Sequence, residues 1–350
     1  LLGNRPRGTL YAVYSFLMKY MGVRFWTPRE EAVPKLDRIA MPEARICYAP
    51  PVAVRIVYAR MLLENPDFAA KSRLFGPNYT ASPEWGGDRI NLIGPWHTFD
   101  RFLPAAEYLK SNPEYFSLRD GQRVGGQFKG QLCLTDARLR EKFLNLVREQ
   151  LRQNPDAKII SASQNDNDNF CQCAACRKLD AAGRSHAASL LDSVNFIAGH
   201  VEQEFPGAEV QTFAYQYSRK PPEGIQPRKN VSILLCAIEA DASKKLTDPQ
   251  SPENTAFVND LKAWQKTGAK LAFWYYAVNF NQFLLPHPNY ESVKSDITWL
   301  AGLSPSMLLV ECDAANLNPI DDLLVMKCWI AAQLMWDPSL DAEKLEEEFL

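Results

Sequence analysis

Residues 158–176, KIISASQNDNDNFCQCAAC, decide the predicted fold. An apolar, strand-like start at Ile159, Ile160 and Ala162 runs without a helical gap into amides and carboxylates, and then into three closely spaced cysteines. A continuous apolar run is typical of a buried parallel strand, and α/β barrels carry their chemistry on the loops that follow such strands. The stretch therefore predicts a barrel strand that ends in a functional loop.

Strand-like and helix-like patterns alternate along the rest of the chain. We predict strands at residues 54–58, just before His97, and at residues 131–135, 158–163, 209–215, 231–238, 270–275 and 307–310. Helices with an apolar stripe are predicted at residues 139–151, 190–205, 257–264 and 293–300. This alternation predicts an α/β fold, specifically a (β/α)8 barrel of the TIM type.

The first residues do not belong to this pattern. An apolar helical run at residues 9–21 stops at Gly22 and leads into the strand-like VRFW, after which prolines punctuate residues 30–51. We therefore expect a domain boundary near residue 50, with the barrel at residues 51–350. Because the chain opens without a methionine and ends in a helical pattern, DAEKLEEEFL, we expect an excised piece, truncated at its C-terminal end and without its signal peptide.

Composition excludes several classes of protein. The chain is 46% hydrophobic and 23% charged, with a net charge of −2, and its Lys and Arg residues are dispersed, so we expect no nucleic-acid partner. No apolar run approaches the length of about 18 residues needed to span a membrane. Most of the eight cysteines stand singly in apolar segments, which is not the pattern of a disulfide scaffold.

Carboxylates and aromatic residues follow the later predicted strands. Glu239 and Glu311 come directly after apolar strands, and Trp274 and Tyr276 end another. Glycoside hydrolysis needs one carboxyl group to protonate the leaving oxygen and a second to stabilise or attack the anomeric centre, while flat rings stack on sugars. Acidic residues at strand ends also cap helices, but Glu caps less well than Asp, which favours these two glutamates as the catalytic pair.

Further residues near strand ends are candidates for substrate binding. Carboxylate, amide and phenol groups would bind sugar hydroxyls, and an indole ring would stack on a sugar face. A histidine in such a place orients a loop as readily as it touches a sugar. The candidates are Asp166, Asn167, His97, Trp274, Tyr276 and Asn279.

Cys171, Cys173 and Cys176 have near-chelating spacing. With a fourth ligand from elsewhere they would hold a structural zinc ion, and the alternative is unligated or locally disulfide-bonded thiols. The glycines at residues 121–130 do not follow a strand and open a helix, and the motifs HExxH and GxSxG do not occur. Apart from this zinc site, we expect no cofactor.

Six stretches carry a resemblance to known families. Residues 7–28, RGTLYAVYSFLMKYMGVRFWTP, look like the end of the small α/β domain that precedes the barrel in several exo-hexosaminidases and α-glucuronidases. The remaining five together resemble bacterial proteins of glycoside hydrolase family 163, first catalogued as a domain of unknown function. They are HTFDRFLP (97–104), NPEYFSLRDGQR (112–123), SQNDNDNFCQCAAC (163–176), WYYAVNFNQFLLPHPN (274–289) and LMWDP (334–338).

This resemblance implies a retaining endo-β-N-acetylglucosaminidase that acts on complex N-glycans, free or on glycoproteins. It implies a secreted, periplasmic or cell-surface protein of gut-type Bacteroidetes, and residues 1–50 as the end of a small α/β domain with its linker. The glutamates of the family pattern fall on Glu239, as general acid/base, and on Glu311. The second carboxylate is then the nucleophile or polarises the substrate N-acetyl group, which attacks in its place.

Two other classes stay open. An inverting or uronic-acid-directed glycosidase would need a cation for the sugar carboxylate, which Arg219 or Lys244 could supply. Carboxyl groups about 5 Å apart would indicate direct nucleophilic attack, and groups about 6.5–9.5 Å apart would indicate inversion or substrate assistance. The third reading is a carbohydrate-binding barrel without catalytic activity.

Overall fold

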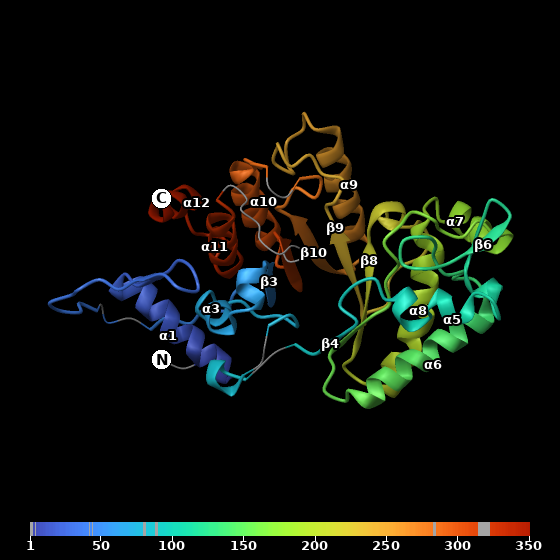
Figure 1. The fold of residues 1–350 in the computed structure, drawn as a ribbon, viewed down its shortest axis with the longest axis horizontal. Helices are drawn as coiled ribbons and strands as arrows, with labels where there is room; N and C mark the ends of the chain where they lie inside the picture. Colours follow the sequence, from blue (N-terminus) through green and yellow to red (C-terminus); the bar gives the residue numbers. More distant parts are fainter. Residues whose placement is uncertain are drawn as a thin grey trace. The chain divides into compact units, whose positions relative to one another are not determined.

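The computed structural model describes residues 3, 5–41, 43, 45–79, 82–87, 90–282, 285–313 and 323–350. It is an α/β structure in which helices and strands alternate (Figure 1). The chain divides into two compact units, and we describe each unit by itself. The first unit comprises Leu1–Ile90, Ala240–Thr255 and Phe273–Leu350, and the second comprises Asn91–Glu239 and Ala256–Ala272.

The main sheet has seven strands in the order β3-β11-β10-β9-β8-β7-β4. Seven of the eight predicted strands are present, and the neighbouring pairs within each unit run parallel. The parallel strands are consistent with a TIM-like fold, and the closure of a complete barrel stays a prediction. The strands are β3 (Val54–Tyr58), β4 (Leu92–Ile93), β7 (Ile159–Ser161), β8 (Glu209–Ala214), β9 (Val231–Cys236), β10 (Lys270–Tyr276) and β11 (Met307–Glu311).

The predicted strand at residues 131–135 is wrong. Leu132 forms an isolated antiparallel bridge with Phe116, next to the short hairpin of β5 (Ser117–Arg119) and β6 (Gln122–Val124). The chain then turns, because the amide of Asp136 donates to the carbonyl of Cys133 over 2.9 Å. These local hydrogen bonds, and not a parallel neighbour, satisfy the backbone of this apolar segment.

Two amphipathic helices cover the core of the second unit. α6 (Ala137–Gln153) begins where the side chain of Asp136 accepts the amide of Leu139, and α8 (Ala187–Glu204) packs on β8 and β9. The apolar stripes predicted for both helices are buried, except for Phe205, which is half-buried just beyond α8, and this confirms the positions of the helices. The unit also contains α4 (Phe99–Phe102), α5 (Ala105–Tyr108), η2 (Pro113–Tyr115), α7 (Ala174–Ala182) and η3 (Gln216–Ser218).

The first unit is built around β3, β11 and the apolar helix α11 (Leu324–Trp336). The predicted N-terminal helix is α1 (Pro6–Met21), which ends at Gly22 with a φ of +67°, a conformation that glycine adopts without strain. Residues on both sides of position 50 belong to this unit, and the boundary there stays a prediction. Its other elements are β1 (Arg24–Phe25), β2 (Glu31–Ala32), α2 (Arg60–Leu63), α3 (Pro66–Lys71), η1 (Pro83–Trp85), α10 (Tyr290–Gly302) and α12 (Ala342–Phe349), while α9 (Pro252–Lys266) belongs partly to each unit.

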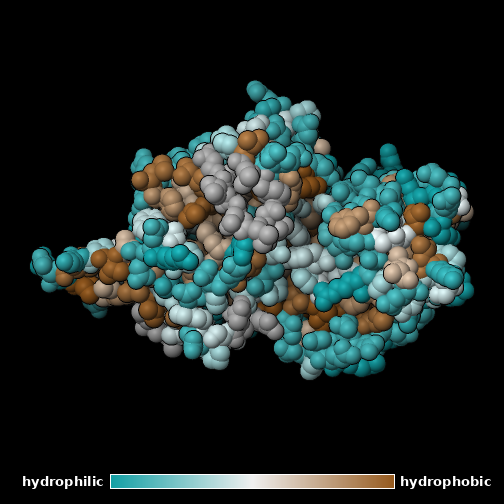
Figure 2. Space-filling model, in the orientation of Figure 1, coloured by the Kyte–Doolittle hydropathy of each residue, from teal (hydrophilic) through white to brown (hydrophobic). Residues whose placement is uncertain are grey.

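Apolar side chains are exposed along residues 33–48, the extended segment at the left of Figure 1. Brown side chains gather on the same segment in Figure 2, among teal ones. The exposed apolar residues of this segment are Val33, Leu36, Ile39, Met41, Ile46 and Tyr48. In the part of the chain that the structure describes, no helix has the length and hydropathy of a membrane span.

Candidate functional site

In the first unit, a carboxylate and two aromatic rings meet where β10 and β11 end. Glu311 is the last residue of β11 and is buried, and the indole Nε1–H of Trp274 donates to its Oε2 over 2.7 Å. Tyr276 shares a face of β10 with Trp274, because side chains alternate along a strand, and the two rings lie 6.0 Å apart at 16°. The structure thus brings together three of the predicted residues, as an acid beside a flat aromatic platform.

Two other polar residues near these strand ends form hydrogen bonds within the first unit. Asp313 is buried and accepts the amide of Arg60, at the first residue of α2, over 3.0 Å. The side chain of Asn279 accepts the amide of Asn281 over 3.1 Å, which closes a turn in the loop after β10. The contact of Asn279 favours a role in loop structure.

In the second unit, Asp166 and His97 lie together. The Nδ1–H of His97 donates to the carbonyl of Gln164 over 2.8 Å, which leaves Nε2 at 4.0 Å from Oδ1 of Asp166. Burial lowers the pKa of His97, so the imidazole is neutral at neutral pH. Tyr215, which follows β8 and was not among our candidates, donates to the same Asp166 oxygen over 2.9 Å.

Asn167, the neighbour of Asp166, faces back into its own loop. Its side-chain amide donates to the carbonyl of Gln127 over 3.0 Å, and its side-chain oxygen accepts the amide of Asn169 over 2.9 Å. The side chain of Gln131 in turn donates to the Asn167 carbonyl over 2.7 Å. These contacts favour a role in holding the loop after β7 over a role in sugar binding.

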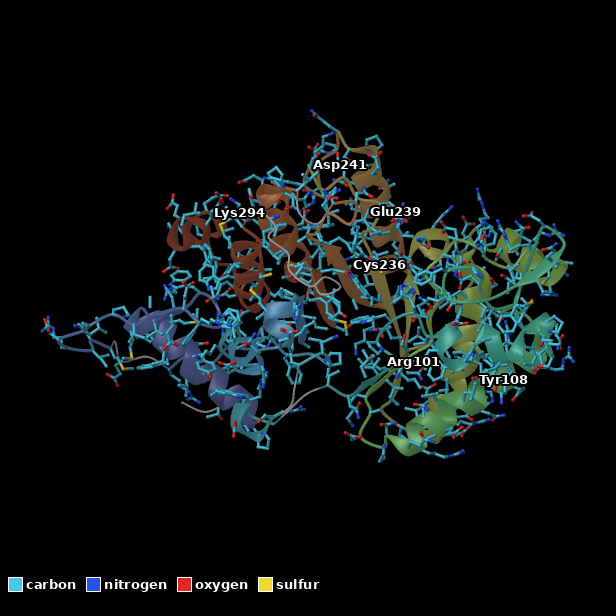
Figure 3. The ribbon with its side chains drawn as sticks, viewed as in Figure 1. Arg101, Tyr108, Cys236, Glu239, Asp241 and Lys294 are labelled. Carbon is cyan, nitrogen blue, oxygen red and sulfur yellow. The ribbon has the colours of Figure 1, made fainter. Side chains whose placement is uncertain are left out.

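Glu239 lies just beyond β9 in the same unit (Figure 3) and forms an ion pair. The Arg219 guanidinium donates to Glu239 over 2.9 Å and to Asp260 over 2.8 Å, and the backbone of Arg219 accepts the Trp264 indole N–H over 2.7 Å. About a third of the Glu239 side chain is exposed, at 38%. Glu239 and Glu311 therefore lie in different units, each with a partner of its own.

Lys244, the other cation proposed for a sugar carboxylate, lies 3.6 Å from Asp241 in the loop after β9. The Ser243 hydroxyl and amide also bind Asp241, and the hydroxyl hydrogen bond lowers the pKa of its carboxyl group. Both proposed cations, Arg219 and Lys244, thus have acidic partners within the protein.

Four cysteines gather in the second unit. The predicted group of Cys171, Cys173 and Cys176 is joined by Cys133, and the four Sγ atoms all lie within 4.8 Å of one another. The thiols of Cys171 and Cys176 hydrogen-bond to Cys133 and hold its pKa well below the usual range, and the same contact raises the pKa of Cys171 to about 11. Cys133 was not predicted as a member of this group, because it is the only cysteine in an apolar, strand-like segment.

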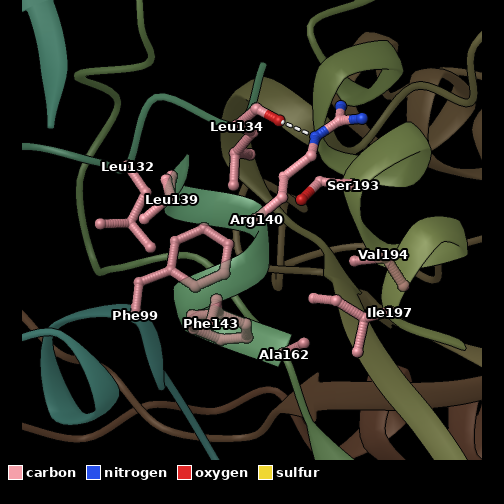
Figure 4. Close-up of a pocket in the computed structure, with 10 residues that line it drawn as sticks. All are labelled: Phe99, Leu132, Leu134, Leu139, Arg140, Phe143, Ala162, Ser193, Val194 and Ile197. Carbon is pink, nitrogen blue, oxygen red and sulfur yellow. Dashed lines mark hydrogen bonds between the residues drawn. The ribbon is translucent and has the colours of Figure 1, made fainter. Parts of the chain in front are cut away.

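A small cavity lies elsewhere in the second unit, between α6 and α8 (Figure 4). Its volume is about 10 Å³, and its lining is mostly apolar, with the Arg140 guanidinium donating to the carbonyl of Leu134 over 2.6 Å. A space of this size holds at most one water molecule, so it is a packing defect and not a sugar site.

The fold and these strand-end groups define an α/β protein whose parallel strands carry acidic and aromatic residues where they end. The chain belongs to the family described as "Domain of unknown function (DUF4838)", which matches residues 25–350. A comparison with curated proteins finds no match.

Solved structures with a similar fold include glycoside hydrolases. A family 89 glycoside hydrolase from Clostridium perfringens, in complex with 2-acetamido-1,2-dideoxynojirmycin, is 8% identical with a TM-score of 0.55. The C. perfringens protein CpGH89, in complex with its substrate GlcNAc-α-1,4-galactose, is 10% identical with a TM-score of 0.57. Each match covers 99% of this chain and 44% of the other, so this chain spans less than half the length of these proteins. At this identity the likeness is one of fold.

Proposed function

We propose that the chain is the catalytic barrel of a glycosidase, a retaining endo-β-N-acetylglucosaminidase that acts on complex N-glycans. The observation that carries the proposal is the buried Glu311 carboxylate beside the Trp274 and Tyr276 rings at the ends of two parallel strands. Oxocarbenium chemistry needs a positioned carboxylate, and sugar rings stack on flat aromatic faces. The fold shared with a glycosidase whose substrate carries N-acetylglucosamine supports the sugar class, and the resemblance to glycoside hydrolase family 163 supports the linkage.

We assign Glu311 as the second carboxylate and Glu239 as the general acid/base. The Trp274 N–H fixes one oxygen of Glu311, which orients the carboxylate either to attack the anomeric carbon or to polarise the substrate amide. The Arg219 guanidinium donates to Oε2 of Glu239, which leaves Oε1 as the oxygen that would carry the proton for a leaving group.

Substrate contacts follow from the remaining predicted residues. Trp274 would stack on a sugar ring, and Tyr276, Asp166 and His97 would bind hydroxyl groups. Tyr215, which donates to Asp166, fixes the orientation of that carboxylate. The contacts of Asn167 and Asn279 within their own loops make them weaker candidates.

A uronic-acid-directed enzyme fits the geometry less well. Arg219 is held by Glu239 and Asp260, and Lys244 lies beside Asp241, so a sugar carboxylate would have to displace an existing acidic partner. A carbohydrate-binding barrel without activity is the remaining alternative, and it would bind glycans without cleaving them. We place the enzyme outside the cytoplasm, as a secreted, periplasmic or cell-surface protein, because its proposed substrates are extracellular glycoproteins.

Mass spectrometry of released products tests the proposal. The protein is incubated with a glycoprotein that carries complex N-glycans, alongside the variants Glu239→Gln and Glu311→Gln and the control Glu149→Gln, an exposed residue of α6. We expect the wild type and the control to release an oligosaccharide that ends in GlcNAc, and each active-site variant to lose at least about 100-fold in rate. No release by folded wild-type protein would overturn the proposed substrate.

A further inference from the structure

We propose that Cys133, Cys171, Cys173 and Cys176 bind one structural zinc ion. Three of these cysteines lie close together in the sequence, and the fold adds the fourth, so that all four Sγ atoms lie within 4.8 Å of one another. A tetrathiolate zinc site uses four cysteines, two or more of them closely spaced, and holds the ion tetrahedrally. The inference is independent of the proposed glycosidase activity.

The distances among the sulfur atoms fit this geometry. Four sulfurs at about 2.3 Å from a central zinc ion lie about 3.8 Å from one another. The Sγ atoms of Cys133 and Cys173 are 3.7 Å apart, and all four cysteines are free thiols. Cys133, Cys171 and Cys176 are buried, and four thiols facing one common point in a protein interior need an explanation that packing alone does not give.

The surroundings of the cluster suit negatively charged thiolates. The amide of Leu118 donates to Sγ of Cys171 over 3.3 Å, and the amide of Cys176 donates to Sγ of Cys173 over 3.5 Å. The Thr135 hydroxyl lies 3.1 Å from Sγ of Cys176. Arg123 lies beside Cys133 and adds a positive charge. Such outer contacts orient the ligands and offset the net negative charge of a tetrathiolate zinc site.

The cluster joins segments that are far apart in the sequence. Cys133 precedes α6, Cys171 contacts the hairpin strand β5, and Cys173 caps the N-terminus of α7. A bound ion would therefore fasten the loop after β7, which carries Asp166, to the segment of Cys133 that precedes α6. With four protein ligands and no open position, the ion would have a structural role.

The donor set favours zinc over other groups. Four soft thiolates in a compact tetrahedron select zinc or a single iron ion. In an iron–sulfur cluster several iron and sulfide ions separate the cysteine ligands, so their sulfur atoms lie farther apart. His186 is the histidine closest in sequence to the four cysteines. Its Nδ1 is hydrogen-bonded to Oδ2 of Asp180 over 3.1 Å. The four ligands are therefore all cysteines, and no histidine ligand is needed.

Elemental analysis of the full chain, purified without chelator, tests the proposal. We expect one zinc per chain, and a loss of at least half of that zinc in Cys133→Ser and Cys176→Ser. Cys236→Ser changes a buried cysteine of β9 in the same unit and should keep its zinc. Wild-type protein that holds no zinc after purification with added zinc would overturn the proposal, as would Cys133→Ser with full occupancy.

A second measurement does not depend on whether the variants fold. Wild-type protein is loaded with cobalt(II), and the expected result is the intense visible absorption of a tetrahedral tetrathiolate, which zinc then abolishes. Chelator should lower the Tm by about 10 °C, since binding energy at a structural site is folding energy. Stoichiometric iron in place of zinc, or disulfides among the four cysteines in intact-mass analysis, would contradict the assignment.

Discussion

The carboxylate of Glu311 is buried, and the indole N–H of Trp274 holds one of its oxygens. A hydrogen bond to a charged group contributes about 1.5–3 kcal/mol, more than a bond between neutral groups. The neighbouring ring of Tyr276 stacks on Trp274. The Trp274 indole therefore both orients the Glu311 carboxylate and forms part of the aromatic platform. A change at Trp274 can therefore separate these two roles.

We predict that Trp274→Phe lowers kcat about 10-fold to 100-fold and changes KM less. The phenyl ring keeps an aromatic face for the sugar but removes the donor to Glu311. Steady-state kinetics on a complex N-glycan checks this, with Glu149→Gln, an exposed residue of α6, as the control outside the site. An unchanged kcat in Trp274→Phe would show that the hydrogen bond from Trp274 does not position the Glu311 carboxylate.

At the scale of elements, Asp296 ties helix α10 to the loop that follows β9. Its two oxygens accept the amide of Leu246 over 2.8 Å and the hydroxyl of Tyr275 over 3.1 Å. Burial raises the pKa of Asp296 to about 7. An unfolded aspartate titrates near pH 3.9, so between about pH 4 and 7 the folded chain binds the extra proton, and stability falls as the pH rises.

We predict that Asp296→Asn flattens this dependence. Asparagine keeps an acceptor for Leu246 but does not titrate, so its free energy of unfolding should decline less than that of the wild type between pH 5 and 8. Urea denaturation at several pH values measures the difference, with the exposed Asp156→Asn as the matched control. If Asp296→Asn and the wild type gave the same slope, Asp296 would not be the titrating group.

Lys294 of α10 (Figure 3) links this helix to α12. Its side chain is 3% exposed, and its ammonium binds Glu343 over 2.8 Å, Glu291 over 2.7 Å and Glu346. We predict that Lys294→Ala lowers the free energy of unfolding by about 2 kcal/mol, because it leaves three acidic groups without their shared cation.

The exposed Lys344, 3.3 Å from Asp341, provides the control for Lys294. Lys344→Ala should cost less than about 0.5 kcal/mol, as exposed ion pairs contribute little. Denaturant titration of both variants checks the contrast. Equal losses would mean that the cluster around Lys294 behaves as a solvated surface pair.

Elements with their own periodicity could be predicted from the sequence, and contacts between distant segments could not. β3 at Val54–Tyr58 and the stripe of α6 were both predicted, because their patterns depend on local spacing. Residues 131–135 have the apolar sequence pattern of a strand. In the structure, however, Leu132 forms an isolated bridge with Phe116, and the segment is not part of the main sheet. That error also hid Cys133 as a fourth ligand.

In the candidate site, too, groupings that follow from strand positions could be predicted, and contacts that depend on tertiary packing could not. Glu311 with Trp274, and Asp166 with His97, could be grouped because residues after parallel strands share an edge of a sheet. The ion pair of Glu239 with Arg219, which in turn binds Asp260, depends on tertiary packing and left no signal in the sequence.

In the whole molecule, the four clustered cysteines and the glutamates Glu239 and Glu311 are separate groups of residues. The zinc proposal depends on the cysteines of the second unit, and its failure would leave the roles proposed for Glu239 and Glu311 unchanged. The glycosidase proposal depends on Glu239 and Glu311, and a zinc site without activity would leave a folded, carbohydrate-binding barrel.

The anomeric configuration of the first product tests the central claim most directly. Proton NMR during the first minutes of cleavage of a complex N-glycan distinguishes the two anomers of the newly released GlcNAc end before they interconvert. A retaining endo-β-N-acetylglucosaminidase forms the β anomer first, whether a carboxylate or the substrate amide attacks. Initial formation of the α anomer, or no cleavage at all, would contradict the account.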